Sequence, residues 1–298
     1  MDVSVIVVNY NTGELIRACL DSVLKQVDVK KEIIVVDNAS QDISLQVLET
    51  YRDRVRVIIN IENKGFACAN NQAAHLAQGQ YLFLLNPDAS FQDLHALKNM
   101  FDMMQSHPEI GLSGTQVIKG KTGGYSAPQF FYPGQRHTSL DYSFLPGKIA
   151  WVIGASMMMR RDVFEKLKGF DEDYFLYGEE ADLCLRIRKM GFQIGYNPLV
   201  VVDHLGGGSE FQTRPSELWR KKQKGLHLFI QKNYPLEEAT KIIEMHIHRA
   251  KRKLFFLKIK KLLGLFRQRE ENNYERYQTI LSTSEKFIET LMRGRLCV

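Results

Sequence analysis

Two groups of polar residues have the types and spacing that metal-assisted and acid–base chemistry need. The first is Asn86-Pro87-Asp88, which directly follows the apolar run Tyr81–Leu85. Proline blocks continuation of a central strand, so the chain must turn and leave Asp88 free to reach a divalent ion bound to phosphates. The alternative is an aspartate that only stabilises its own turn.

His204 is the residue that could complete such a metal site. It follows the apolar run Leu199–Val202 and precedes the glycine-rich stretch Gly206–Ser209. An imidazole ligand beside Asp88 would favour Mn²⁺ over Mg²⁺. A histidine with a purely structural role is the competing interpretation.

The second group is Glu179-Glu180-Ala181-Asp182, at the start of a predicted helix. A helical wheel puts Glu179 and Asp182 on one polar face, where Asp182 is spaced to pair with Arg186. Glu180 falls on the apolar face. An inward carboxylate is costly unless it is paired or functional, and burial and the helix N-terminus shift its pKa in opposite directions. Such opposing effects can tune a general base.

Buried parallel strands are the elements that must position these residues. Apolar runs rich in Val, Ile and Leu alternate with helical patterns, which is typical of βαβ units. The predicted strands are Ser4–Val8, Glu32–Val36, Val55–Ile59 and Tyr81–Leu85, and the helical patterns cover Leu15–Val27, Leu45–Arg52, Phe66–Ala77 and Leu94–Gln105.

Polar residues follow three of these strands: Asn9-Tyr10-Asn11, Asp37-Asn38 and Asn86-Pro87-Asp88. Ligands of open α/β sheets lie outside the carboxyl ends of the strands, so these clusters should converge. Asp37 could accept a hydrogen bond from a base or ribose, or could instead cap a helix that starts near Ser40. The first cluster lacks the G-x-G-x-x-G pattern of a dinucleotide-binding enzyme.

Charge divides the chain into two predicted domains. Residues 214–298 contain 20 Lys and Arg against 9 Asp and Glu, a net of +11, which leaves −5 for residues 1–213. We therefore expect a catalytic α/β domain at 1–213 and a basic helical extension at 214–298. Residues 119–148 are turn-rich and read as a long surface insertion, a candidate loop over the site.

The basic extension has a segment that suits a membrane surface. Residues 245–269 hold nine Lys and Arg and no acid, and 254–267 present an arc of Phe, Leu and Ile. This pattern favours an anionic membrane surface or, equally, a helix docked on its own protein. It does not match a nucleic-acid-binding module. Four scattered cysteines and no signal-peptide pattern favour a cytoplasmic protein, peripheral on the inner face of the membrane if the extension binds lipid.

The ordered motifs resemble the inverting family 2 glycosyltransferases, in particular their bacterial rhamnosyltransferase-like branch. The resemblance covers residues 3–209 through V-V-N-Y-N, V-D-N-A-S, N-K-G-F-A, N-N, L-L-N-P-D, G-A, F-L-Y-G-E-E-A-D-L-C-L-R and H-L-G-G-G-S. It implies a GT-A fold, a mostly parallel Rossmann-like sheet flanked by helices, with a C-terminal helical extension.

The resemblance also implies roles for individual residues. Asp37 would bind a pyrimidine base with Tyr10 beside it, Asp88 and His204 would hold Mn²⁺ or Mg²⁺, and Glu180 would deprotonate the acceptor with support from Glu179 and Asp182. The remaining residues expected at the nucleotide-sugar site are Asn11, Asn38, Asn63, Gly65, Asn71, Asn86, Gly154 and Ala155.

Two departures from the family pattern affect these roles. Asn86 replaces the first aspartate of the D-x-D motif, so Asp88 must do more of the metal binding. Glu180 stands where the family commonly has Asp, which changes the reach of the base and makes Asp182 the second choice for that role.

The implied reaction is transfer of a sugar from a dTDP- or UDP-linked donor to a saccharide or lipid-linked acceptor. The branch likeness suggests rhamnose and the synthesis of a cell-surface polysaccharide. Two alternatives are a nucleotidyltransferase, which would usually show a glycine-rich phosphate loop after the first strand, and a non-catalytic membrane-surface protein on a transferase fold.

Overall fold

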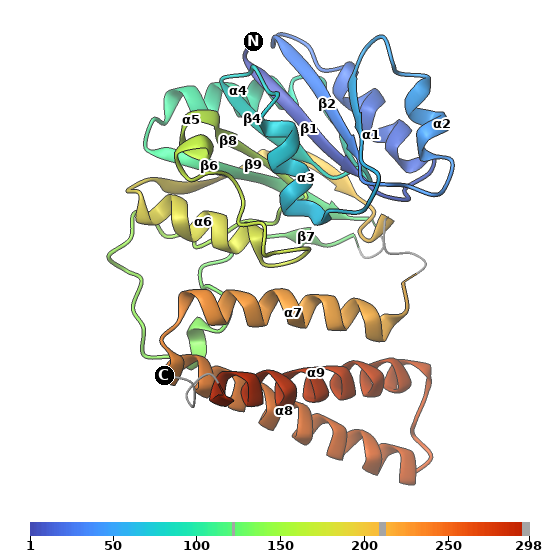
Figure 1. The fold of residues 1–298 in the computed structure, drawn as a ribbon, viewed down its shortest axis with the longest axis vertical. Helices are drawn as coiled ribbons and strands as arrows, with labels where there is room; N and C mark the ends of the chain where they lie inside the picture. Colours follow the sequence, from blue (N-terminus) through green and yellow to red (C-terminus); the bar gives the residue numbers. More distant parts are fainter. Residues whose placement is uncertain (121–122, 209–212, 294–298) are drawn as a thin grey trace. The chain divides into compact units, whose positions relative to one another are not determined.

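The computed structural model describes residues 1–120, 123–208 and 213–293, and its central element is a nine-stranded mixed sheet (Figure 1). The strand order is β3-β2-β1-β4-β8-β6-β9-β5, with β7 paired to β6. The strands are β1 (Val3–Asn9), β2 (Lys31–Asp37), β3 (Arg56–Ile59), β4 (Tyr81–Leu85), β5 (Ala89–Phe91), β6 (Ile110–Lys119), β7 (Tyr125–Ser126), β8 (Ser156–Arg160) and β9 (Gln193–His204).

The four strands predicted in the first part of the chain all form, and they pair in parallel. In β1, β2 and β4 the buried Val, Ile, Leu and Phe side chains explain why, since a strand covered on both faces needs apolar residues at most positions. The strand β3 lies at the edge of the sheet, and its side chains are half-buried or exposed. The sheet is mixed because β8 pairs antiparallel with both β4 and β6. The expected α/β class with a mostly parallel sheet is therefore confirmed.

Helices cover the sheet of the α/β unit on both faces. The helices of the chain are α1 (Leu15–Leu24), α2 (Ser44–Glu49), α3 (Gly65–Ala74), α4 (Ala96–Ser106), α5 (Arg161–Lys166), α6 (Glu179–Lys189), α7 (Pro215–Asn233), α8 (Leu236–Leu262) and α9 (Gln268–Arg293), with a 3₁₀ turn at Gln135–His137. One core cluster joins α1, α2 and α4 to alternate residues of β1, β2 and β4. The intervening residues, such as Ile6, Ile34 and Leu84, are also buried.

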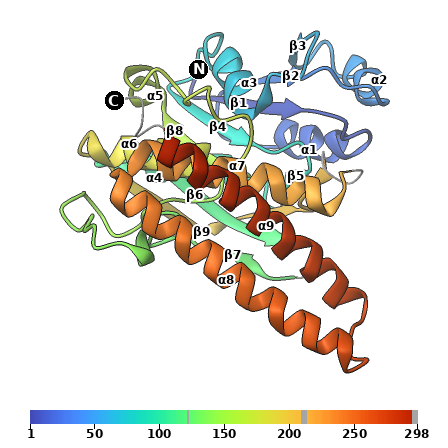
Figure 2. The ribbon, with the colours of Figure 1, turned by 60° about the horizontal axis from the view of Figure 1, so that its bottom comes forward.

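The chain forms two compact units. The α/β unit comprises residues 1–131, 142–175 and 179–211, and the helical unit comprises residues 132–141, 176–178 and 212–298. The helical unit is built from α7, α8 and α9, with α9 packed against both other helices (Figure 2). No described helix is long and apolar enough to span a membrane.

Part of the predicted surface insertion at 119–148 belongs to the helical unit. The Tyr132 ring stacks on Phe229 at 6.1 Å, and the Tyr234 hydroxyl donates to the Pro133 carbonyl at 2.9 Å. Tyr132 and Phe229 are both buried. This segment is therefore a packed component of the helical unit, because its aromatic residues bury apolar area against the helices.

Two histidines of the helical unit predict how its stability depends on pH. Burial lowers the pKa of His227 to about 4, and the charge of His246 adds to this effect. Burial also lowers the pKa of His246 to about 4, with contributions from the charges of His137 and Arg249. Histidines of the unfolded chain have a pKa of about 6.5. Between that pH and about pH 4 the unfolded chain therefore binds more protons than the folded chain. We expect stability to be full above pH 6.5 and to be lost as the pH falls toward 4.

Thermal unfolding followed by circular dichroism at pH 7.5 and pH 5 checks this expectation. The melting temperature should fall at the lower pH, and a His227→Gln/His246→Gln variant should show a smaller fall. The exposed His248 supplies a matched control, His248→Gln. Equal pH dependence in wild type and the double variant would contradict the assignment.

Candidate functional site

The ends of β1 and β2 form a buried polar cluster around Asp37. The parallel register pairs Asn9 with Asp37, and Asn9 Nδ2 donates to Asp37 Oδ1 at 2.7 Å. The other carboxylate oxygen of Asp37 accepts from the Ser40 amide at 2.9 Å. The Asp37 side chain thus holds the turn that follows β2. It does not cap a helix, because α2 begins only at Ser44 and its N-cap residue is Ile43, and its role toward a base stays a prediction.

Asn11 and Tyr10 lie on the adjoining turn after β1. The Asn11 amide donates to Ser40 Oγ at 2.9 Å, and Asn11 Oδ1 accepts from the Gln41 amide at 2.7 Å. Asn11 adopts φ 50°, which asparagine tolerates better than most residues. Tyr10 is half-buried. The turns after β1 and β2 are therefore tied into one structure.

A second part of this cluster joins Asn38, Asn63 and Gly65. Asn38 Nδ2 donates to Asn63 Oδ1 at 2.8 Å, and Asn63 Oδ1 also accepts from the Gly65 amide at 2.9 Å. Gly65 has φ +80°, and a Cβ there would lie 2.5 Å from the Phe175 carbonyl oxygen. Glycine is thus required at the start of α3 both for its backbone conformation and for this close approach.

Asn71 does not join that cluster. Its Nδ2 donates to the Phe170 carbonyl at 2.9 Å, and its Oδ1 accepts from the Phe170 amide at 2.8 Å. It lines a cavity of ≈ 850 Å³ between α3 and α5, together with Lys64, Cys68, Arg161 and other residues. The described contacts of Asn71 hold the loop before α6, and its predicted place in the donor site remains untested.

The end of β4 brings a third group together. The Asn86 amide donates to the Ala155 carbonyl at 2.9 Å, and Asn86 Nδ2 lies 3.3 Å from His204 Nε2. The same His204 nitrogen lies 3.2 Å from Asp88 Oδ1. Pairing of β5 with β9, in which Ala89 is opposite His204, sets this approach. Residues 118 positions apart in the sequence therefore share one site.

Asp88 is held ionised in a largely buried position. Burial acts to raise the pKa of this carboxyl group, but the hydrogen bond and charge of His204 and the Gly208 amide outweigh it and hold the pKa below its usual value. The Gly208 amide donates to Asp88 Oδ2 at 2.9 Å. A Cβ at Gly208 would lie 2.7 Å from Asp88 Cβ, so only glycine fits here. Ser209, where the family resemblance ends, lies outside the described residues.

Asp88 and His204 have donor atoms that fit two neighbouring positions around a divalent ion. Adjacent ligands of an octahedral ion with bonds of about 2.1 Å lie about 3 Å apart, and the two donors here are 3.2 Å apart. Among the described residues no group of three or more His, Cys, Asp and Glu could hold an ion. Protein ligands alone would therefore leave most coordination positions to phosphate or water oxygens.

The carboxylates of α6 differ from the helical-wheel prediction. Glu179, expected on the polar face, is 5% exposed, whereas Glu180, expected to point inward, is half-buried. The polar face predicted for Glu179 and Asp182 was wrong because α6 is covered almost all round, with Asp182 only 4% exposed. The wheel separates faces only when one side of a helix meets water.

Asp182 and Glu179 have different electrostatic surroundings. Asp182 Oδ2 accepts from Arg186 Nε at 2.7 Å, as the spacing predicted, and Arg186 also donates to the Gly169 carbonyl at 2.9 Å. Glu179 Oε2 is buried without a hydrogen-bond partner in the described part of the chain. Burial raises the pKa of Glu179 well above its usual value, and the charge of Glu180 adds to the effect.

Glu180 is linked to the strand-end group through Gly154. A Cβ at Gly154 would lie 3.5 Å from Glu180 Cβ. Gly154 precedes Ala155, whose carbonyl binds the Asn86 amide. The start of α6 therefore packs against Gly154, and the next residue, Ala155, is bonded to Asn86 of the strand-end group.

Sequence reasoning did not assign a role to Asn9, Ser40 or Gly208, although each binds a predicted site residue. Asn9 and Ser40 occur inside the V-V-N-Y-N and V-D-N-A-S motifs, and their fixed distance from strand ends was the available signal. Nothing in the sequence pairs Gly208 with Asp88, because that contact depends on how the chain turns after β9.

The sheet order and the strand-end site define a GT-A type glycosyltransferase fold, and solved structures agree. The chain is similar to the mannosyltransferase PcManGT from Pyrobaculum calidifontis, with a TM-score of 0.62 and 19% identity over 96% of this chain and 86% of that one. It is also similar to residues 1–349 of TarS from S. aureus, with a TM-score of 0.57 and 18% identity over 97% of this chain and 92% of that one. At such identities the likeness shows the fold.

The family follows from the sequence itself. Residues 4–168 match the model of glycosyl transferase family 2, and residues 134–203 match one described as the N-terminal domain of galactosyltransferase. The first match covers more than half of the chain, so the chain belongs to glycosyl transferase family 2. The resemblance derived from the ordered motifs is confirmed.

Curated relatives include bacterial rhamnosyltransferases and cell-surface polymer enzymes. The O-antigen chain rhamnosyltransferase RfbN of Salmonella typhimurium is 25% identical over 68% of this chain and 66% of its own length. The N-acetylglucosaminyl-diphospho-decaprenol L-rhamnosyltransferase of Mycobacterium tuberculosis is 24% identical over 67% of this chain and 75% of its own length. The O-antigen biosynthesis protein RfbC of Myxococcus xanthus is 28% identical over 64% of this chain, which spans only 16% of that protein's length.

Proposed function

We propose that the protein is an inverting glycosyltransferase that moves a sugar from a nucleoside diphosphate donor to an acceptor hydroxyl. The observation that carries this proposal is the contact of Asp88 with His204 at the ends of the central strands. Membership of family 2 supports the same reaction class. The packing of Glu180 against Gly154, two residues from the start of β8, supports a proton acceptor on the same side of the sheet.

The donor would lie across the ends of β2, β1 and β4. Asp37, Asn38 and Asn63 form the polar edge that would face the nucleoside, and Asn86 and Ala155 would lie toward the diphosphate and sugar. PcManGT was solved with GDP-mannose and TarS with UDP-GlcNAc, both nucleoside diphosphate sugars. For this chain we propose a dTDP- or UDP-linked sugar, with rhamnose favoured by the rhamnosyltransferase relatives.

Asp88 and His204 would hold a divalent ion, Mn²⁺ or Mg²⁺. When bound, such an ion stabilises negative charge on the departing diphosphate. The buried position of Asp88 and its lowered pKa keep the carboxylate ready to bind a cation at neutral pH. PcManGT was solved with Mn²⁺. Asn86 would serve beside the ion as a neutral neighbour.

Glu180 would act as the general base. Burial and the charge of Glu180 raise the pKa of Glu179 well above its usual value. Glu180 is the less buried carboxylate of the pair, which leaves it accessible to an acceptor hydroxyl. The acceptor oxygen would bond to the anomeric carbon as the bond from that carbon to the diphosphate oxygen breaks, and the hydroxyl proton would pass to Glu180. Attack opposite the leaving group inverts the configuration. Asp182 is committed to Arg186 and would support the helix.

The acceptor would be a saccharide or a lipid-linked saccharide of a cell-surface polysaccharide. The named acceptor of the mycobacterial relative is a diphospho-decaprenol-linked sugar, and other relatives take part in O-antigen and teichoic-type polymers. We further propose that the helical unit meets an anionic membrane surface. Along the last turns of α8 and in the turn that leads to α9, five apolar side chains are 55–87% exposed: Phe255, Phe256, Leu262, Leu263 and Leu265.

The charge around this turn is suited to anionic lipid. Lys258, Lys261 and Arg267 are exposed beside the apolar side chains. Apolar side chains that insert at the headgroup level and cations that face lipid phosphates act together in interfacial helices. Exposing so much Leu and Phe to water is otherwise unfavourable.

Glu180→Gln is expected to abolish transfer while leaving donor affinity nearly unchanged, because the amide keeps the shape but cannot accept the proton. Initial rates with radiolabelled nucleotide sugar and calorimetric donor binding measure the two effects. The exposed Glu165 provides the matched control Glu165→Gln, which should retain activity. Residual turnover within about tenfold of wild type would rule out Glu180 as the base.

Sedimentation with vesicles tests the membrane surface. The wild type should pellet with vesicles that contain phosphatidylglycerol at moderate salt, and Leu262→Ser/Leu263→Ser should lose most of this binding because the inserted apolar area is gone. Leu199 in the α/β unit is 83% exposed, so Leu199→Ser is a matched control that should bind normally. Failure of the wild type to pellet would end this part of the proposal, without bearing on catalysis.

A further inference from the structure

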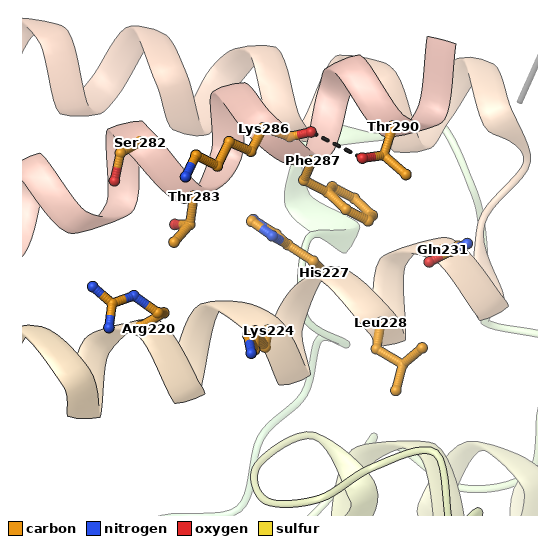
Figure 3. Close-up of a pocket in the computed structure, with 10 residues that line it drawn as sticks. All are labelled: Arg220, Lys224, His227, Leu228, Gln231, Ser282, Thr283, Lys286, Phe287 and Thr290. Carbon is orange, nitrogen blue, oxygen red and sulfur yellow. Dashed lines mark hydrogen bonds between the residues drawn. The ribbon is translucent and has the colours of Figure 1, made fainter. Parts of the chain in front are cut away.

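The helical unit contains a cavity between α7 and α9 that the proposed transfer reaction does not use. Its volume is ≈ 520 Å³, and Figure 3 shows its lining side chains. The lining residues are Arg220, Lys224, His227, Leu228, Gln231, Ser282, Thr283, Lys286, Phe287 and Thr290. Cavities of this size accommodate small molecules or the head group of a lipid.

Three cations line this cavity without an acidic partner. Arg220, Lys224 and Lys286 form no ion pair with any described residue, and none of the described lining residues is acidic. Glu285, next to Lys286 on α9, pairs instead with Lys251 at 3.1 Å. All three side chains are exposed, so water screens their mutual repulsion, and together they give the rim of the cavity a positive potential that attracts an anionic group.

Apolar surface forms the other part of the cavity. The His227 ring stacks on the Phe287 ring with centroids 4.4 Å apart and planes 10° apart, and Leu228 lies on the next position of α7. Ser284 Oγ lies 3.3 Å from His227 Nε2. Burial keeps the pKa of His227 at about 4, so this ring is uncharged at neutral pH and contributes to the apolar wall.

Two of the three cations lie at the opposite end of the cavity from the apolar groups, and Lys224 lies between Arg220 and Leu228 (Figure 3). In Figure 3 the guanidinium of Arg220 and the ammonium of Lys286 are at one end, and Leu228 and Phe287 are toward the other. The hydroxyls of Thr283 and Thr290 donate to helix carbonyls, so the cations and the Gln231 amide are the groups available to an incoming anion. A ligand that is anionic at one end and apolar at the other would fit both the cationic and the apolar parts of the cavity.

We propose that this cavity binds a phosphate group attached to an apolar chain, that is, a lipid phosphate. The three cations would bind the phosphate oxygens, and the His227–Phe287 stack and Leu228 would contact the first carbons of the chain. Guanidinium and ammonium groups are the side chains that bind phosphate in proteins. A membrane glycerophospholipid and a prenyl diphosphate both have this chemistry.

The proposal does not rest on the transfer reaction, because binding is measured directly. Farnesyl diphosphate and dihexanoyl-phosphatidylglycerol, both used below micelle-forming concentration, are the two probes. Inorganic pyrophosphate tests the phosphate without the chain, and farnesol tests the chain without the phosphate. The tighter of the two lipid probes identifies the source of the phosphate.

Calorimetry with Lys224→Gln/Lys286→Gln should show at least about tenfold weaker binding of the better lipid probe, because two charge-assisted contacts are lost. The exposed Lys253 on α8 is not a lining residue, and Lys253→Gln should bind as wild type does. A photoreactive farnesyl diphosphate should label peptides of α7 and α9. Labelling confined to the strand ends of the α/β unit would mean that the probe binds as a donor analogue and would overturn the proposal.

Three other results would also overturn it. These are wild-type affinity in the double lysine variant, pyrophosphate binding as tight as that of the lipid probes, and farnesol binding as tight as that of farnesyl diphosphate. A protein that catalyses transfer normally but fails these tests would retain the proposed function and lose only the lipid-phosphate site.

Discussion

The parallel pairing of β1 with β2 and β4 is the constraint on which the candidate site depends. It sets Asn9 opposite Asp37 and brings the turn after β4 to the same edge. Buried polar side chains at that edge then bond to one another, as Asn9 does to Asp37 and Asn38 does to Asn63. Because buried polar groups are costly when unpaired, a shift of one residue in this register would break the cluster.

The buried charges of the site are balanced by neighbours from distant parts of the chain. Asp88 stays ionised because His204 and the Gly208 amide compensate for its burial. Glu179 Oε2 has no hydrogen-bond partner among the described residues, and burial together with the charge of Glu180 raises the pKa of Glu179. Burial therefore has opposite outcomes at the two carboxyl groups: the pKa of Asp88 is lowered, which suits binding of a cation, and the pKa of Glu179 is raised.

The sequence predicted the parallel strands and the convergence of their ends, because short continuous runs of Val and Ile are typical of strands that are buried on both faces. It did not reveal β6, since the glycines, serine and threonine of Ile110–Lys119 lack a strand-like apolar pattern although the strand lies between β8 and β9. It also misjudged Glu179, because a single helix pattern cannot show what covers the helix. The Asp88–His204 pair could be proposed from strand-end position alone, because each residue closely follows an apolar strand, and the family likeness agreed with it.

The proposed function depends on one binding event, in which a nucleoside diphosphate sugar binds at these strand ends together with a divalent ion. Calorimetric titration of dTDP- and UDP-sugars, with and without Mn²⁺, tests it most directly in wild type and Asp88→Asn. We expect at least one donor to bind, and we expect Mn²⁺ to strengthen that binding in the wild type but not in the variant. Absence of binding by every donor, or an equal effect of Mn²⁺ in Asp88→Asn, would contradict this expectation.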